Sequence, residues 1–216
     1  MDSARRAGRP STAILSKERI VDAAFAVLRE SGTDKFSMTR VAEALSVRVP
    51  ALYNHFRNKT ALVDAMREQV AKDIDATPFD RLPWDEAVVP WAWSYRDAFA
   101  ARPAGIDLLA ATPVDTPQVA EDYERISRGL RRGGWPLEEI VDVIVTLESF
   151  VIGSALDALA PADNLRLTAA AEHAPEFVAA ERTRAAKPGI AADRTFEIGL
   201  RVLVSGLRLR LAELTG

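Results

Sequence analysis

Apolar residues recur at spacings of three and four along most of this chain, and nowhere do they alternate with polar residues for long enough to indicate a sheet. The pattern is clearest over residues 196–214, where an apolar residue stands at every third or fourth position. Apolar residues make up 48% of the 216 residues and charged residues 27%, which supplies a core and excludes a disordered chain. The sequence therefore predicts an all-α fold of nine or ten helices.

Breaks in this pattern divide the chain into three parts. Residues 1–15 contain three arginines and no helical periodicity, so we expect a flexible basic arm. A proline-containing break over residues 76–83 ends the next part. We therefore expect a small three-helix domain within residues 16–75 and a larger helical domain over residues 84–216.

The small domain is predicted to contain two short helices joined by a tight bend. Ser37 is placed to cap the first, over residues 38–45, and the second follows over residues 48–56. Pro50 falls in its first turn, where the missing N–H costs nothing. This is the helix-turn-helix pattern, in which the first helix braces the second and the second reaches base edges in the major groove. Similar pairs occur in other all-α proteins, so spacing alone leaves the interpretation open.

Other helix ends follow from local signals. Ser16 is placed to cap the first helix and Gly32 to end it. Pro90 is expected to kink one helix of the larger domain or delay its start, and Asp193 to cap the last helix. In the larger domain we expect helices over residues 84–101, 106–111, 117–132, 136–161, 175–186 and 193–214.

Charge is unevenly distributed along the chain. Residues 1–60 carry 11 Lys and Arg against six Asp and Glu, a balance of +5, whereas the whole chain carries −3 and the remainder therefore −8. Clustered cations suit phosphate contacts, and an acidic body repels DNA elsewhere. Chance is the alternative explanation of this asymmetry.

The stretch SMTRVAEALSVRVPALYNHFRNKTALVDAM carries the most specific signal in the chain. It resembles the DNA-binding domain of the TetR family of transcriptional repressors, and its most telling part is VRVPALYNHFRNKTAL. The resemblance covers about 50 residues, 20–66. It departs from the family at the bend, where Ser46 stands in place of the usual glycine; in a left-handed conformation a side chain there costs roughly 1–2 kcal/mol.

The resemblance implies roles for individual residues of this segment. It places Tyr53, His55 and Lys59 on backbone phosphates. It places base contacts at Arg48, Val49, Ala51 and Asn54, with Thr39 and Arg40 contributing from the preceding helix.

The chemistry of these side chains limits what they read. Arg48 favours guanine and Asn54 favours adenine, whereas Val49 and Ala51 suit a thymine methyl group. The alternative is that these residues are ordinary surface or packing positions. Arg9, in the segment RRAGRP, is expected to enter an adjacent minor groove, unless the arm is only a solubilising tail.

Beyond residue 84 the chain resembles the tetracycline-repressor type of C-terminal domain more weakly. The matching pieces are individually unspecific: WDEA, Tyr95-Arg96, ARP, Gly134-Trp135 and FEIGLRVLVSGL. They imply a helical domain that binds a small molecule and forms a dimer. Gly199, Val202 and Gly206 form a narrow face on the last helix that lets a partner helix approach, with packing inside one chain as the alternative.

A ligand pocket in this domain is expected to be apolar with a few polar groups. Aromatic residues at helical spacing are more often core than pocket, so each assignment is separate. The candidate lining residues are Trp91, Tyr95, Phe99, Leu108, Leu109, Thr112, Leu147, Phe150, Val151 and Asp157, with Trp93 and Glu148 beside them.

We expect neither a metal nor a cofactor. The chain has no cysteine and two histidines, His55 and His173, far apart in sequence. Tetracycline repressors hold a drug–magnesium complex with a histidine in the segment where this chain has Ile106 to Leu109, and none stands there. Asp157 falls where those repressors keep an acid, but one carboxylate is no metal site. The expected inducer is therefore apolar or aromatic and metal-free.

These observations favour a ligand-responsive, homodimeric repressor that leaves a palindromic DNA operator when a small molecule binds. No apolar stretch approaches the roughly 18–20 residues of a membrane span, so we expect no membrane partner and a soluble, cytoplasmic protein. An enzyme or ligand carrier is the alternative from another class, and it lacks any phosphate loop or nucleophile motif. A DNA-binding activator or architectural protein is the third interpretation.

Overall fold

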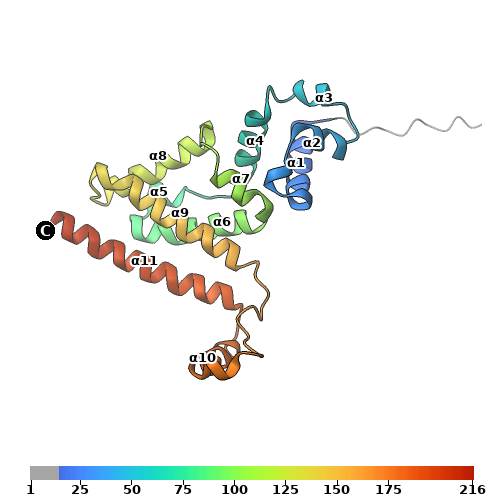
Figure 1. The fold of residues 1–216 in the computed structure, drawn as a ribbon. Helices are drawn as coiled ribbons and strands as arrows, with labels where there is room; N and C mark the ends of the chain where they lie inside the picture. Colours follow the sequence, from blue (N-terminus) through green and yellow to red (C-terminus); the bar gives the residue numbers. More distant parts are fainter. Residues whose placement is uncertain (1–14) are drawn as a thin grey trace, which may run out of the picture. The chain divides into compact units, whose positions relative to one another are not determined.

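The computed structural model describes residues 15–216, so Arg9 and nearly all of the expected basic arm lie outside the described residues. The described chain is entirely helix and loop, with no strand, which confirms the all-α prediction (Figure 1). Its α-helices are α1 (Lys17–Ser31), α2 (Met38–Ala44), α3 (Val49–Tyr53), α4 (Lys59–Ala71), α5 (Pro78–Arg81), α6 (Trp84–Ala100), α7 (Ile106–Ala110), α8 (Pro117–Arg132), α9 (Ile140–Asp157), α10 (Pro175–Ala185) and α11 (Ala191–Thr215).

Four short 3-10 turns join these helices: η1 (Thr33–Lys35), η2 (Pro103–Gly105), η3 (Leu137–Glu139) and η4 (Ala171–His173). The chain forms two compact units that divide between Leu62 and Val63. The division falls inside α4, so one continuous helix begins in unit 1 and continues into unit 2.

Unit 1 begins and ends its helices where short-range signals predict. The Ser16 Oγ accepts a hydrogen bond from the Arg19 N–H at 3.3 Å and caps α1. Gly32 ends that helix with φ 75°, a conformation that glycine adopts without strain. The Ser37 Oγ accepts from the Arg40 N–H at 3.3 Å and caps α2. All three expectations are confirmed.

The bend between α2 and α3 is a left-handed helix end occupied by a residue with a side chain. Ser46 has φ 56°, and it is the one non-glycine residue with positive φ among residues 15–216. Its N–H donates to the Glu43 carbonyl at 2.9 Å, and the Val47 N–H donates to the Ala42 carbonyl at 3.0 Å. This bond pair is the Schellman motif, which normally takes glycine. The backbone bonds therefore hold Ser46 in a strained conformation.

The helix after this bend is shorter than predicted. It ends at Tyr53 instead of residue 56, because the backbone turns there: the N–H groups of His55 and Phe56 both donate to the Leu52 carbonyl at 2.9 Å. Leu52 is fully buried and Phe56 is 4% exposed, so these two side chains anchor the segment on the core of unit 1.

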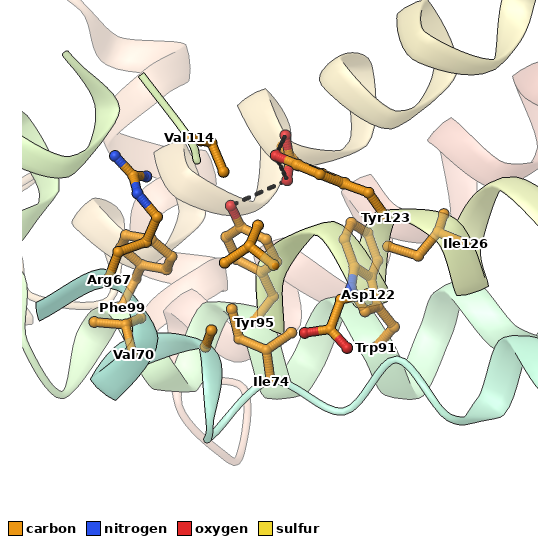
Figure 2. Close-up of a pocket in the computed structure, with 13 residues that line it drawn as sticks. Arg67, Val70, Ile74, Trp91, Tyr95, Phe99, Val114, Asp122, Tyr123 and Ile126 are labelled. Atoms are coloured by element: carbon orange, nitrogen blue, oxygen red, sulfur yellow. Dashed lines mark hydrogen bonds between the residues drawn. The ribbon is translucent and has the colours of Figure 1, made fainter. Parts of the chain in front are cut away.

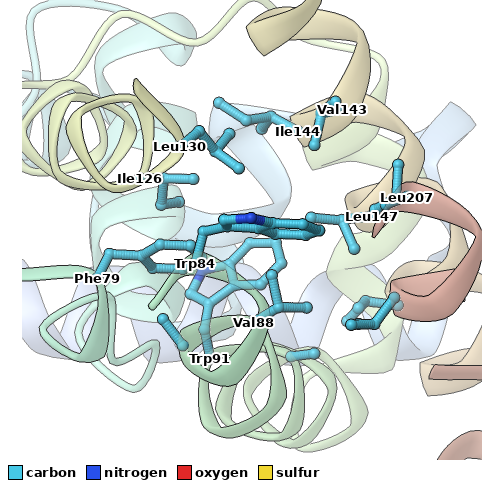
Figure 3. Close-up of a cluster of buried hydrophobic side chains, with 14 of the residues drawn as sticks. Phe79, Trp84, Val88, Trp91, Ile126, Leu130, Val143, Ile144, Leu147 and Leu207 are labelled. Atoms are coloured by element: carbon cyan, nitrogen blue, oxygen red, sulfur yellow. The ribbon is translucent and has the colours of Figure 1, made fainter. Parts of the chain in front are cut away.

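The core of unit 2 forms around α6 and α9, with α5, α8 and α11 packed against them. Figure 3 shows buried side chains from these five helices converging on one cluster. Aromatic rings meet edge to face within it: Trp84 lies 5.4 Å from Trp135, and Phe79 lies 6.0 Å from Trp91, measured between ring centroids. Gly133 lets α8 approach Trp84, because a Cβ there would lie 2.2 Å from the indole Cδ1.

Two expectations about helix ends in unit 2 are corrected. Pro90 lies inside α6, which runs unbroken from Trp84 without a delayed start. Asp193 does not cap α11, which begins two residues earlier. Its carboxylate instead accepts a hydrogen bond from Arg96 at 2.7 Å. Arg96 is 3% exposed, so the long-range ion pair fixes the position of Asp193.

No helix within the described residues combines the length and the apolar character that a membrane crossing requires.

Candidate nucleic-acid interface and ligand pocket

The first candidate site is the outer surface of α3 and of the residues at its two ends. Arg48 stands at the N-terminus of α3 and Asn54 at its C-terminus, and both side chains are exposed. Val49 and Ala51, between them, are partly exposed. Because Leu52 turns into the core, the opposite side of this segment faces solvent with two strong hydrogen-bonding side chains and two small apolar ones.

Tyr53 and His55 lie next to this surface. Tyr53 is 50% exposed, which places its ring on the surface rather than inside a helix interface. His55 is partly exposed, and Thr39 and Arg40 are exposed on the first turn of α2. The structure thus gathers hydroxyl, imidazole, amide and guanidinium groups along residues 39–55, a set that suits phosphate and base edges.

Lys59, predicted to contact a phosphate, has two partners within unit 1. Its Nζ donates to the Phe36 carbonyl at 3.1 Å and lies 5.1 Å from the centroid of the Phe36 ring. These contacts hold the start of α4 against the residue that precedes Ser37. Lys59 remains exposed, so its phosphate contact stays a prediction.

The second candidate site is a pocket in unit 2 (Figure 2). Its cavity volume is about 60 Å³, and about 490 Å³ when the space out to the open mouth is included. The smaller volume holds only a few water molecules, so a larger guest requires side chains to move. The lining residues are Arg67, Val70, Ala71, Ile74, Trp91, Tyr95, Phe99, Val114, Val119, Asp122, Tyr123, Ile126 and Glu148.

Glu148 is the polar centre of this pocket. Its Oε1 accepts hydrogen bonds from the Tyr95 hydroxyl at 3.3 Å and the Tyr123 hydroxyl at 3.1 Å (Figure 2). Burial raises the pKa of Glu148, although the two tyrosine hydroxyls and Arg67 oppose that shift. Burial also raises the pKa of Tyr123 to about 12, and that of Tyr95 further, with the nearby carboxylate adding to both.

Arg67 closes one side of the pocket from α4. Its Nη2 donates to the Leu109 and Thr112 carbonyls, each at 2.9 Å, and to the Thr112 Oγ1 at 2.7 Å. These acceptors lie at the end of α7 and just beyond it, where helix carbonyls lack partners within the helix. The guanidinium therefore clamps α4 to the end of α7.

Asp122 adds a second carboxyl group to the lining. Gln118 donates to its two oxygens at 3.5 and 3.4 Å. Burial raises the pKa of Asp122, with the hydrogen bond from Gln118 opposing the shift. Among residues 15–216 no three histidine or acidic side chains gather as a metal ion would need.

Three of the predicted lining residues, Trp91, Tyr95 and Phe99, line the pocket, and so does Glu148. The others lie elsewhere. Leu147 and Val151 are fully buried in the core cluster, because they lie on the side of α9 that packs on α6. Phe150 stacks on Phe196 at 5.4 Å, and Asp157 lies at the far end of α9.

The residues predicted from α7 and from the segment just after it are also absent from the pocket lining. Leu108 and Leu109 are buried, and the Thr112 hydroxyl group accepts a hydrogen bond from Arg67. Trp93 lies against Arg96 and Phe196. Sequence reasoning missed the contributions of α4 and α8, because periodicity shows which face of a helix is buried but not where neighbouring faces leave a gap. Glu148, a carboxylate in the middle of the mainly apolar sequence of α9, is the signal that the sequence offers.

Two family models match this chain. The model described as bacterial regulatory proteins, tetR family, matches residues 20–66. The model described as tetracyclin repressor-like, C-terminal domain, matches residues 78–211. The first match covers the α3 surface, and the second covers the part of the pocket lining from Trp91 to Glu148.

Individual relatives agree over nearly the whole length. The chain is 31% identical to the tetracycline repressor protein class A from transposon 1721 of Escherichia coli, over 91% of this chain and 92% of that protein. The structure of ActR of Streptomyces coelicolor in complex with actinorhodin matches with a TM-score of 0.69 at 27% identity, covering 92% of this chain and 99% of that one. BioQ of Mycobacterium smegmatis with its double-stranded DNA operator matches with a TM-score of 0.60 at 26% identity, covering 90% and 98%.

Proposed function

The chain belongs to the TetR family of DNA-binding transcriptional regulators and is not an enzyme, and from that premise we propose that it is a repressor released from a palindromic operator by a small apolar or aromatic molecule. In this proposal residues 16–75 bind DNA, and residues 84–216 bind the ligand and dimerise. The proposal also places the protein in the cytoplasm, where the DNA of a bacterial regulatory protein lies.

The exposed surface of α3 is the single observation that carries the DNA-binding half of the proposal. Arg48 and Asn54 present strong hydrogen-bonding groups at its ends, and Tyr53 and His55 stand beside it for phosphate contacts. A helix entering the major groove contacts bases with such residues. The operator found with BioQ supports the same partner for this chain.

A homodimer follows from the need to read a palindrome and from exposed apolar side chains on α9 and α11. The most exposed of these are Val141, Val145, Ile198, Val202 and Leu209. We propose that these two helices and their symmetry mates form a four-helix bundle.

The small-residue face of the last helix is used differently from the sequence prediction. Gly206 and, on α9, Gly153 have open space where a Cβ would lie, and they suit a partner helix. Gly199 does not, because a Cβ there would lie 2.6 Å from the Phe150 ring of the same chain. Gly199 therefore serves the contact between α9 and α11 within one chain.

Release follows from the place of α4. This helix begins in unit 1 at Lys59 and supplies Arg67, Val70 and Ala71 to the pocket wall. A ligand too large for the present cavity displaces this wall and moves α4, which changes the spacing of the two α3 helices in the dimer. Only the unliganded spacing then matches successive major grooves.

The test is a gel shift with the DNA that flanks the protein's own gene, repeated over a range of salt concentrations. We expect specific retention by the wild type, lost in the double variant Arg48→Ala, Tyr53→Ala and kept in Arg29→Ala, which removes an exposed cation from α1. Equal retention of unrelated DNA contradicts a specific operator. A ligand that binds but leaves retention unchanged contradicts release, and a reporter gene that falls rather than rises when the protein is removed indicates an activator.

A further inference from the structure

We propose that the ligand of the unit 2 pocket is a small aromatic cation, whose ammonium group lies against the Glu148 carboxylate and whose ring lies among the aromatic side chains beside it. The inference rests on the proposed function, because it names the chemical class that this ligand pocket takes.

The lining holds more negative than positive charge. Glu148 and Asp122 contribute two carboxyl groups, against the single guanidinium of Arg67. That guanidinium already donates to carbonyls of Leu109 and Thr112. Within the described residues no salt bridge joins Glu148 to a cation, and its hydrogen-bond donors are two neutral hydroxyl groups. The pocket therefore provides an acidic group whose hydrogen-bond donors are neutral and which forms no ion pair with Arg67.

Burial makes this arrangement favour a cation over other guests. It raises the pKa of both Glu148 and Asp122, which means that each carboxylate has lost water without gaining an equivalent charge partner. A cation beside Glu148 offsets the free-energy cost of this desolvation. A neutral guest leaves the cost unchanged, and an anion adds like-charge repulsion.

The apolar part of the lining suits the same class of molecule. Tyr95 stacks on Phe99 with 5.1 Å between ring centroids, and Trp91 meets Tyr95 edge to face at 5.3 Å. Aromatic faces attract an ammonium group and also stack on an aromatic ring. Figure 2 shows Tyr95 between Phe99 and Trp91, with the hydrogen bond from its hydroxyl group to the carboxylate.

The test compares three probes of matched size that differ in charge: 2-phenylethylammonium, 2-phenylethanol and phenylacetate. Titration calorimetry on the DNA-free protein near pH 7 measures each dissociation constant. We expect the cation to bind at least about 10-fold more tightly than the alcohol, and the alcohol more tightly than the anion, because a charge-assisted contact in a desolvated site exceeds a neutral one.

A pair of variants assigns this preference to one carboxylate. Glu148→Gln keeps the size of the side chain and an acceptor for the tyrosines, and we expect it to reduce the preference for cation over alcohol to about 3-fold or less. The control, Glu121→Gln, removes the same charge from an exposed position of α8 outside the pocket, and we expect it to keep the preference. Circular dichroism verifies that both variants fold.

Tighter binding of the alcohol or of phenylacetate, no detectable binding of the cation, or an unchanged preference in Glu148→Gln overturns the inference. These results are independent of the proposed function, because the gel shift without ligand measures operator binding separately. A pocket that prefers a neutral or anionic probe leaves the repressor proposal intact. Loss of operator binding with an intact cation preference would contradict the repressor proposal and leave the inference about the ligand standing.

Discussion

Side chains of the α3 surface reach solvent from a single short segment, residues 48–55, whereas those of the pocket come from five parts of unit 2 and bond to one another. On α3 the exposed residues stand apart from the buried Leu52 that anchors the helix. In the pocket the lining groups, such as Trp91 and Glu148, also belong to the packing of the unit or border it. We therefore expect substitutions on the α3 surface to change DNA binding without changing stability, and substitutions in the pocket to change both ligand binding and stability.

Trp91→Ala gives the largest expected effect and tests the coupling directly. Trp91 is 1% exposed and contacts both Phe79 and Tyr95, so removing its ring leaves a cavity between the core and the pocket. We expect a loss of about 3–5 kcal/mol in the free energy of unfolding, measured with urea. Val89→Ala, on an exposed part of α6, is the control and should change it by no more than about 0.5 kcal/mol. Equal losses of unfolding free energy in the two variants would mean that Trp91 contributes no more to the core than the exposed Val89.

Arg67→Met tests the clamp between α4 and α7. The substitution keeps an apolar stem but removes the guanidinium that donates to the Leu109 and Thr112 carbonyls. We expect a loss of about 1–3 kcal/mol in thermal or urea unfolding. Lys72→Met removes an exposed cation just after α4 and should have little effect. Equal losses of stability in the two variants would mean that the hydrogen bonds from Arg67 to α7 add nothing to the effect of removing a charge.

Ser46→Gly should raise stability. Ser46 holds φ 56°, where glycine is unstrained, but glycine also increases the entropy of the unfolded chain. The balance predicts a gain of about 0.5–1 kcal/mol in the free energy of unfolding. Ser46→Ala is the control, since it removes the hydroxyl and keeps the strain. A gain in both variants would assign the effect to the hydroxyl group and not to the backbone.

These positions also show how far sequence reasoning reaches. Ser16, Gly32 and Ser37 end or begin helices as predicted, because a cap depends on atoms three or four residues away. Asp193 has the chemistry of a cap, yet its partner is Arg96, 97 residues away in sequence. No local pattern carries that information.

The same distinction applies to the two candidate sites. The residues proposed to contact DNA fall in one recognisable motif, so the sequence predicts them together. The pocket depends on where α4, α6, α8 and α9 fail to cover one another, so the sequence identified Tyr95 and Glu148 but not Arg67 or Tyr123. A pocket built by tertiary packing needs the tertiary structure.

The double variant Arg48→Ala, Tyr53→Ala gives the smallest expected effect on stability and the clearest separation. Both side chains are exposed, so we expect the free energy of unfolding to stay within about 0.5 kcal/mol of the wild type. Operator affinity in the same preparation should fall at least about 10-fold, because a lost base or phosphate contact costs about 1–3 kcal/mol. A parallel loss of stability would mean that α3 is coupled to folding as the pocket is.

Hydroxyl-radical footprinting of the DNA flanking the protein's own gene tests the central claim most directly. A dimer that inserts two α3 helices should protect two half-sites related by two-fold symmetry, with centres about 10 base pairs or a multiple of that apart. We expect this paired protection without ligand and its disappearance when an inducer fills the pocket. A single unpaired region of protection, or protection without any sequence preference, would contradict it.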